Sequence, residues 1–415
     1  MTQSSTDEDV QLTIDKGIEE LDPELRELSI KVFQIHENPE LGYSEHKAHD
    51  NVAAFLTSQG FKVTEHAHGL ETSLSAEYGS EGRVVNFNCE YDALPGIGHA
   101  CGHNLIAMGS IAGFIGTVAA LKKYKIPGRV RLLGTPAEEG GGGKIKLLNA
   151  GAYKDVDASF MTHPMSASVM STPTGFSKGI PFGTCVASIK VKATFTGKPA
   201  HGALMPHEGI NALDAAVMAY NGIGLLRQQI KPYERIGIVI LKGGEAPNVI
   251  TPQSVLNYNL RSKTLKEARE LNERAIRCFE GAAISTGCKV NIELTNEYSD
   301  LRPNRALSAV YLAAMDRLDI PQYDNLNELA PWLGSYSTDM GNVTHACPGI
   351  HPCYWIPTDE GVVNHTPEFT AAARTEESHH LTLATSKAMA ATAFKVLSDD
   401  TFAKEVRKEF EHMMC

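Results

Sequence analysis

Cysteine is scarce in this sequence, with 8 residues among 415, so the disulfide framework of a small secreted domain is excluded. Basic residues are not in excess either: 38 lysines and arginines stand against 49 aspartates and glutamates, a formal net charge of −11. This balance argues against nucleic acid as the main partner, because nucleic-acid binding usually needs a basic face. We expect the cysteines to be reduced thiols, available for a metal or catalytic role.

The sequence has no clear export signal and no convincing membrane span. The N-terminal MTQSSTDEDV carries acids where a secretory signal needs a basic region and an apolar run. The best membrane candidate, residues 105–121, is shorter than the roughly 20 apolar residues of a span and contains several glycines. We therefore expect a buried helix there, no membrane partner and a cytoplasmic protein.

The composition, 42% hydrophobic and 21% charged, is that of a globular protein, and the length predicts two or three domains at roughly 150 residues each. In the first part, short β-rich runs alternate with helical stretches: residues 84–89, 130–134 and 156–162 are expected strands, and residues 104–125 and 144–149 are expected helices. This alternation predicts an α/β fold with a mostly parallel sheet and helices on both faces.

The pattern changes near residue 186. Residues 187–195 alternate apolar and polar side chains, as in a half-buried antiparallel strand. The expected elements that follow are a helix (210–225), two strands (236–241 and 254–260), a helix (265–285) and a strand (289–294). The order β-α-β-β-α-β is typical of a ferredoxin-like α+β domain. We therefore predict a catalytic domain in two parts, 1–185 and 302–415, with residues 186–301 inserted between them.

Three loops in the first part carry residues suited to metal binding. Each lies beyond the carboxyl end of an expected strand, the edge where ligands bind in an open α/β sheet. The candidates that these loops bring together are Cys101, His103, Glu138, Glu139 and His163. Thiolate, imidazole and carboxylate are the ligands of zinc and similar divalent ions.

The adjacent pair Glu138 and Glu139 can serve two roles, because one carboxylate can bind metal while the other moves a proton. Each feature alone has a plainer interpretation: an incidental Cys-x-His pair, a solvated acidic turn, and a core histidine at His163. The coincidence of all three at successive strand ends favours the metal site.

Competing motifs do not fit. Gly143-Lys144 lacks the other residues of a phosphate-binding loop. Residues 175–179 match the serine-hydrolase elbow, but Pro173 and Pro181 flank them where a strand and a helix are required. The His-x-Cys pairs at 345–347 and 351–353 lack the Cys-x-x-Cys of a structural zinc site, and we interpret them as loop and core residues.

Four ordered motifs, at residues 91–95, 99–104, 135–140 and 162–164, resemble peptidase family M20, the dinuclear metallopeptidases that include aminoacylases, carboxypeptidase G and indole-acetyl-amino-acid hydrolases. The nearest branch is similar to p-aminobenzoyl-glutamate hydrolases and cytosolic β-alanyl-lysine dipeptidases. The likeness runs from residues 36–42 to residues 364–367.

The resemblance implies two divalent ions per subunit, with zinc favoured by the thiolate and manganese or cobalt as alternatives. Cys101 would bridge the ions, and the other ligands would be His103, Glu139, His163 and His365. Glu138 would be the general base, and Asp92 would orient His103 or a neighbour. Two positions depart from relatives: Asn104 stands where aspartate is common, and Glu90 where other branches carry a metal-binding histidine.

In the inserted domain, the resemblance gives His201 the role of stabilising the oxyanion, from its own subunit or from the partner. Asn248 and Arg261 would hold the carboxylate of a small-molecule substrate. This domain is the family's lid and commonly forms the dimer interface, so a homodimer is expected.

The leading hypothesis is metal-dependent hydrolysis of the amide bond of a dipeptide or N-acyl amino acid that has a free carboxylate. One alternative is that the same site forms or rearranges amides in a biosynthetic pathway. Another is a catalytically silent, metal-containing binding protein, which the presence of Glu138 and His201 disfavours.

Overall fold

The computed structural model describes residues 3–30, 35–172, 175–326 and 336–414. The chain forms two compact units: unit 1 combines Met1–Thr184 with Leu301–Cys415, and unit 2 is Cys185–Asp300. Unit 2 is thus inserted into the sequence of unit 1. The helices of unit 1 are α1 (Gln3–Glu19), α2 (Asp22–Ile30), α3 (His46–Ser58), α4 (His103–Tyr124), α5 (Gly143–Asn149), α8 (Arg305–Arg317), α9 (Met340–Ala346), α10 (Pro367–Ala372), α11 (Glu376–Ser398) and α12 (Asp400–Met414).

The main sheet of unit 1 has six strands in the order β1-β2-β4-β3-β5-β14. These are β1 (Lys62–Glu65), β2 (Leu74–Tyr78), β3 (Val84–Cys89), β4 (Arg129–Gly134), β5 (Ala158–Phe160) and β14 (Gly349–Ile350). The pairings of β3 with β4, β3 with β5 and β5 with β14 are parallel, whereas β1 and β2 add an antiparallel edge. The predicted α/β class with a mostly parallel sheet is confirmed.

Both faces of the central strand β3 are covered, since every one of its residues is buried. Phe87 faces α4, where Gly113 leaves room for its ring: a Cβ on Gly113 would lie 2.7 Å from Phe87 Cε1. Asn88 faces the opposite side, where its side-chain amide contacts Met340 of α9 and Tyr153. The sheet therefore lies between two layers, as α/β architecture requires.

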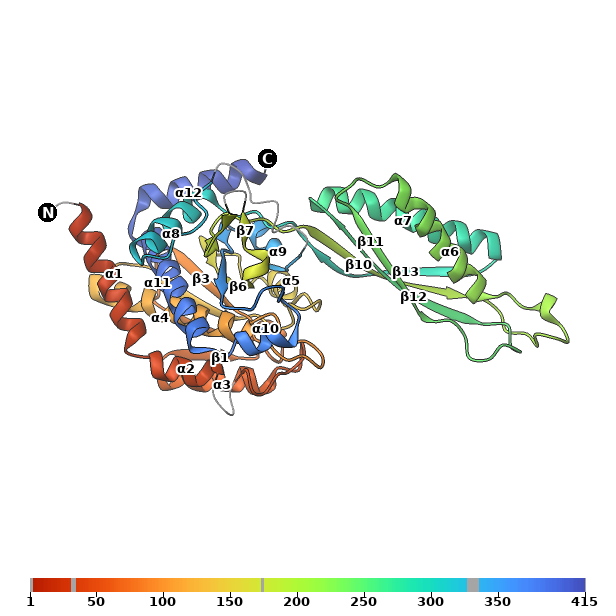
Figure 1. Cartoon of the computed structure of the whole chain (residues 1–415), viewed down its shortest axis with the longest axis horizontal. Helices are drawn as coiled ribbons and strands as arrows, with labels where there is room; N and C mark the ends of the chain where they lie inside the picture. Colours follow the sequence, from red (N-terminus) through yellow and green to blue (C-terminus); the bar gives the residue numbers. More distant parts are fainter. Residues whose placement is uncertain (1–2, 31–34, 173–174, 327–335, 415) are drawn as a thin grey trace. The chain divides into compact units, whose positions relative to one another are not determined.

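Helix α4 is apolar on all sides and forms the centre of the core, packed against α1, α11 and β3 (Figure 1). It corresponds to the expected helix at residues 104–125. Among the described residues it is the one helix long and apolar enough to cross a membrane, and nearly all of it is buried inside the protein. A helix buried on every face is what the core of a large domain demands.

The expected strand at residues 156–162 is wrong at both ends. β5 covers only Ala158–Phe160, and the chain then leaves the main sheet. His163 begins β6 (His163–Ser166), which pairs in parallel with β15 (Cys353–Ile356) in a separate sheet completed by β9 (Gly179–Ile180). In the rejected elbow motif, the first two residues form β8 (Gly175–Phe176), paired with β7 (Ser171–Thr172) in a two-stranded sheet, and Gly179 begins β9.

Unit 2 has a four-stranded antiparallel sheet in the order β11-β12-β10-β13, with α6 and α7 side by side on one face (Figure 1). Its elements are β10 (Ala187–Thr196), α6 (Ala212–Leu226), β11 (Arg235–Lys242), β12 (Gln253–Ser262), α7 (Leu265–Thr286) and β13 (Lys289–Tyr298). The predicted ferredoxin-like order is confirmed. Phe195, Tyr258 and Phe279 stack in its core, between sheet and helices.

Candidate metal centre

A tight turn before α4 places Cys101 and His103. Gly102 is the N-cap of α4 and has φ +78°, a left-handed conformation that glycine adopts without strain. A Cβ on Gly102 would lie 2.5 Å from Cγ of Pro164, so the turn packs directly against the residue that follows His163. This close approach brings the first and third candidate loops together.

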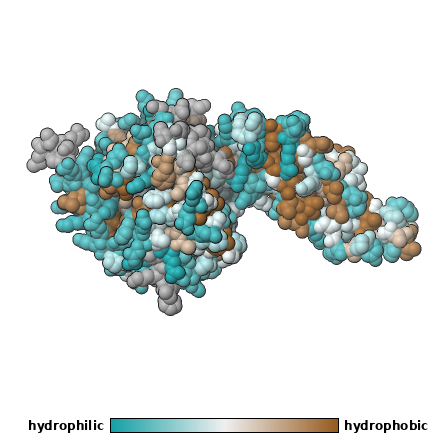
Figure 2. All heavy atoms as spheres, in the orientation of Figure 1, coloured by the Kyte–Doolittle hydropathy of each residue, from teal (hydrophilic) through white to brown (hydrophobic). Residues whose placement is uncertain are grey.

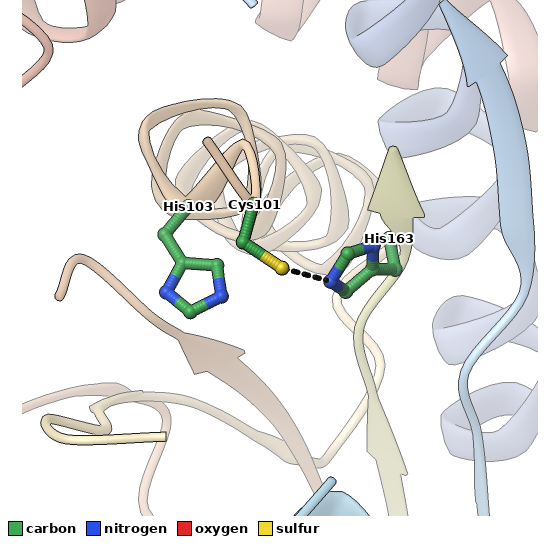
Figure 3. A group of neighbouring side chains, drawn as sticks. All are labelled: Cys101, His103 and His163. Atoms are coloured by element: carbon green, nitrogen blue, oxygen red, sulfur yellow. Dashed lines mark hydrogen bonds between the residues drawn. The ribbon is translucent and has the colours of Figure 1, made fainter. Parts of the chain in front are cut away.

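Cys101 lies at the centre of the candidate ligands. Its Sγ is 3.4 Å from Nε2 of His163, and Figure 3 shows these two side chains pointing toward one another beside His103. On another side, Sγ is 3.3 Å from Nε2 of His365. His365 reaches this position from the turn before α10, where its φ is +69° and its N–H donates to the carbonyl of Ala100 at 2.8 Å. A single sulfur therefore contacts two imidazoles from distant parts of the chain.

The second loop presents its carboxylates from a strained turn after β4. Ala137 has φ +59°, which is uncommon for a residue with a side chain, and its N–H donates to Oε1 of the buried Glu45 at 2.8 Å. Oε1 of Glu139 lies 3.4 Å from Nε2 of His365 and 3.9 Å from Nε2 of His103. The buried Glu138 lies in one compact group with Glu139 and His103.

Asp92 holds the ring of His103 through a hydrogen bond to Nδ1. Nδ1 of His103 donates to Oδ1 of Asp92 at 3.0 Å, which leaves Nε2 as the ring atom available to a cation. Burial opposes a charged ring, but the Asp92 carboxylate outweighs it and raises the pKa of His103 well above its ordinary value. Asp92 therefore increases the basicity of the nitrogen on the far side of the ring.

These residues fit a divalent cation. Three triads of donor atoms each lie within 4.8 Å of one another: Cys101 with His103 and His163, Cys101 with Glu139 and His365, and His103 with Glu138 and Glu139. Two ligands of one tetrahedral zinc ion, at about 2.0–2.3 Å from it, lie about 3.3–3.7 Å apart, close to the separations here. In addition, His103 Nε2 and Glu139 Oε1 are buried and have no hydrogen-bond partner within the described ranges. A cation would satisfy both atoms.

The protonation states also suit such a site. Burial lowers the pKa of His163 to about 3, so its imidazole is neutral, the form that binds metal. Burial raises the pKa of the Cys101 thiol, and a nearby divalent cation would favour the thiolate instead. Burial, together with Glu90 and Glu139, raises the pKa of Glu138 well above the ordinary value. Glu138 is therefore a carboxylate with a strong tendency to take up a proton.

The three candidates of unit 2 can be described within that unit. Nδ1 of the exposed His201 accepts the N–H groups of Ala203 and Leu204 at 3.2 Å, so the ring hydrogen sits on Nε2. His201 pairs with Val249, which places the exposed Asn248 next to it. Arg261 lies on β12, paired with Ser188 and Arg235 on the flanking strands.

Several buried charged residues around the metal centre were given no role by the sequence analysis. Glu45 supports the Ala137 turn, and Lys144 joins Glu90 to Asp339 behind His103. The sequence marks Glu90 by its departure from relatives and Lys144 by the glycine run before it, but it marks Asp339 by no local pattern.

Comparisons with known proteins show which proteins this chain is similar to. Residues 186–286 match the family model described as a peptidase dimerisation domain, M20_dimer. An Xaa-Arg dipeptidase of Mus musculus is 39% identical over 423 residues, which cover 98% of this chain and 94% of that protein. One of the p-aminobenzoyl-glutamate hydrolase polypeptides of Escherichia coli (strain K12) is 27% identical over 92% of this chain and 91% of that protein.

Among solved structures, a Bacillus subtilis protein described as a dinuclear metal binding peptidase from the M20 family superposes with a TM-score of 0.62. The alignment covers 92% of this chain and 99% of that chain at 20% identity. At that identity the likeness demonstrates a common fold.

Proposed function

The chain belongs to the M20 family of metal-dependent peptidases and amide hydrolases, and we propose that it is a dipeptidase for substrates with a basic C-terminal residue. Metal-dependent amide hydrolysis is the activity of the family. The observation that carries the proposal is the convergence of Cys101, His103, Glu139, His163 and His365, with Glu138 beside them. The preference for a basic residue rests on the similarity to an Xaa-Arg dipeptidase.

Two divalent ions at these donors would supply Lewis acidity toward the amide carbonyl and a lowered pKa for the attacking water. Glu138 takes the proton from that water as it attacks, because its buried carboxylate favours the protonated form. The same carboxyl group then delivers the proton to the leaving amine. Asp92 holds the ring of His103 throughout, so the ligand geometry is fixed before the substrate arrives.

The residues of unit 2 act on the substrate. The Nε2–H of His201 donates to the carbonyl oxygen as negative charge develops on it, either from the same subunit or from the partner. Arg261 and Asn248 bind the free carboxylate of the substrate, for which the guanidinium fork of arginine is suited. This pairing restricts the enzyme to dipeptides and N-acyl amino acids rather than internal peptide bonds.

The proposed assembly is a homodimer formed through unit 2. Its edge strand β11 exposes Val239 and Leu241, and α6 exposes Val217, Met218 and Leu225. Figure 2 shows hydrophobic residues gathered on the surface of this unit. An unpaired strand edge beside an exposed apolar helix face is suited to a second copy of the same surface. The match of this unit to a dimerisation domain supports the same assembly.

We propose zinc as the preferred ion because a thiolate lies at the centre of the donors, with manganese or cobalt as alternatives. All seven cysteines in the described part of the chain are free thiols. Free thiols suit a reducing compartment, and the proposed location is the cytoplasm.

The test is hydrolysis of a substrate panel by the protein loaded with Zn²⁺, Mn²⁺ or Co²⁺. The panel contains Xaa-Arg, Xaa-Lys, Xaa-Leu and Xaa-Glu dipeptides, N-acetyl-arginine, p-aminobenzoyl-glutamate and an Xaa-Arg dipeptide amidated at its C-terminus. We expect kcat/KM for Xaa-Arg and Xaa-Lys to exceed the others at least tenfold, and chelation to abolish turnover. Equal or better cleavage of p-aminobenzoyl-glutamate or of the amidated dipeptide would contradict the proposed specificity.

A further inference from the structure

Behind the metal centre lies a lysine with no exposed surface. The Nζ of Lys144, on α5, contacts Oε1 of Glu90 and lies 2.6 Å from Oδ1 of Asp339. The backbone N–H of Lys144 also donates to Oδ2 of Asp339 at 2.9 Å. One ammonium therefore faces two buried carboxylates, and this trio of Lys144, Glu90 and Asp339 keeps one unbalanced negative charge. Burying a net charge is costly unless a further positive charge lies nearby.

The unbalanced charge is directed toward His103. Lys144 occupies Oε1 of Glu90, while Oε2 of the same carboxylate is buried and has no hydrogen-bond partner among the described residues. This free oxygen lies 3.4 Å from Nε2 of His103, the ring atom that Asp92 leaves available. Nε2 of His103 and Oε1 of Glu139 are likewise buried without hydrogen-bond partners in the same part of the chain. Nε2 of His103 thus lies within 4 Å of two buried carboxylate oxygens that lack hydrogen-bond partners, at 3.4 Å from Glu90 Oε2 and 3.9 Å from Glu139 Oε1.

We propose that Glu90 is an additional ligand of the cation that His103 binds, and that Lys144 is the positioning residue that orients its carboxylate. This inference rests on the metal centre of the proposed function. An oxygen and a nitrogen bound to one tetrahedral ion at about 2.0–2.2 Å lie about 3.4 Å apart, as Glu90 Oε2 and His103 Nε2 do. Lys144 allows only one oxygen of Glu90 to face the ion.

Two plainer roles for Glu90 fit less well. A charged hydrogen bond from an imidazolium to a carboxylate is typically about 2.7–2.9 Å long, shorter than the separation between His103 and Glu90. A purely stabilising ion trio is also a weak explanation, because a buried ion pair often contributes less stability than apolar residues of the same size. The ion trio leaves Oε2 of Glu90 unused, whereas coordination of a cation would satisfy this oxygen.

The experiment measures Zn²⁺ binding to the full-length, metal-free protein by competition with a chromophoric chelator, so no turnover is required. Glu90→Gln removes the charge but keeps an oxygen for Lys144, and Glu90→Asp keeps the charge but withdraws the carboxylate by one methylene. Asp339→Asn is the matched control, because Asp339 contacts the same ammonium on the other side. Circular dichroism and thermal unfolding of each metal-free variant establish that it is folded.

We expect Glu90→Gln and Glu90→Asp to weaken binding of one of the two ions at least tenfold, and Asp339→Asn to change it less than threefold. Parent affinity in Glu90→Gln would overturn the assignment. If Glu90→Asp kept the parent affinity while Glu90→Gln lost it, the charge of Glu90 would act at a distance, and the assignment would also be overturned. An equal loss of affinity in Asp339→Asn would overturn it too. A parent protein that binds two ions but cleaves no dipeptide would contradict the proposed function alone, because this test does not depend on activity.

Discussion

Oδ1 of Asp92 accepts a hydrogen bond from Nδ1 of His103 at 3.0 Å, and its other oxygen accepts the backbone N–H of Glu139 at 2.8 Å. One carboxylate therefore orients two candidate ligands that come from different strand ends. It does so while almost fully buried, between the first and the second candidate loop. The orientation of these ligands is thus set by a residue that would not itself contact an ion.

We expect Asp92→Asn to lower Zn²⁺ affinity about 10- to 100-fold, because loss of the carboxylate weakens the basicity and orientation of the His103 ring. The measurement is a Zn²⁺ titration of the metal-free protein against a competing chelator. Asp50→Asn is the control, since Asp50 contacts His49 through a similar pair at 2.8 Å in α3. Unchanged affinity in Asp92→Asn would mean that the position of His103 is fixed without Asp92.

Glu138→Gln is expected to bind both ions and to lose about 10²- to 10⁴-fold in kcat, because the amide cannot accept the proton of the attacking water. The measurements are metal content per subunit and kcat for an Xaa-Arg dipeptide. Glu139→Gln provides the contrast, as it is expected to lose metal content together with activity. Full activity of Glu138→Gln would show that another group is the base.

Glu45 is expected to make stability depend on pH. Burial, followed by the charge of Asp92, raises the pKa of Glu45 from 4.5 to about 7. Between pH 4.5 and about pH 7, the folded state holds more protons than the unfolded chain. The free energy of unfolding therefore falls as the pH rises through this range. Glu45→Gln is neutral and keeps an oxygen for the N–H of Ala137, so it should be more stable than the parent at pH 8 by roughly 1–3 kcal/mol.

Urea unfolding of the metal-free protein at pH 4.5 and pH 8 tests this prediction. The gain should shrink at pH 4.5, where Glu45 is largely protonated in the folded state. The control is Glu40→Gln, at a half-buried carboxylate that accepts the N–H groups of Lys47 and Ala48. An equal gain for both variants, or a gain in Glu45→Gln that is independent of pH, would refute the role given to Glu45.

The dimer is expected to depend on α6. Met218 and Leu225 lie seven residues apart on one exposed side of this helix, and a double change to glutamate would place charge where a second copy is expected to pack. We expect the double variant to elute as a monomer in size-exclusion chromatography with light scattering. Ile284→Glu is the control, because Ile284 is 83% exposed but lies on α7. A dimer that survives the double change, or dissociates with Ile284→Glu, would place the interface elsewhere.

Removal of the ions is expected to lower the melting temperature by several degrees. The buried atoms that a cation would satisfy belong to His103, Glu139 and Glu90, and metal-free protein leaves them unsatisfied. Reloading at a free metal concentration about 1,000 times the dissociation constant would restore about 4 kcal/mol. Differential scanning calorimetry before and after chelation measures the change, and identical melting curves would argue against a cation at these atoms.

Features marked by local sequence patterns were the ones that could be predicted. The alternation in residues 187–195 predicted β10, and the uninterrupted apolar stretch predicted the buried helix α4. Cys101, His103 and Glu139 could be proposed because unusual residue types followed expected strands. His365 has no such context, since it lies alone in a loop, and only the family resemblance indicated it.

What could not be predicted depends on pairings between distant residues. Lys144 meets Glu90 across 54 positions and Asp339 across 195, and no local pattern encodes either contact. The strand that begins at His163 was also missed. Its partner β15 lies far along the chain, and His163-Pro164 is a poor strand signal because proline lacks a donor for the ladder.

His365 follows unit 2 in the sequence, whereas Cys101, Glu139 and His163 precede it. During synthesis, the earlier residues leave the ribosome long before the histidine that completes their set. In the proposed metal centre, the full ligand set would therefore assemble only after unit 2 has been made, and a fragment cut within unit 2 would lack His365. Ion uptake by the proposed centre would thus report that the part of the chain beyond unit 2 has been made and folded.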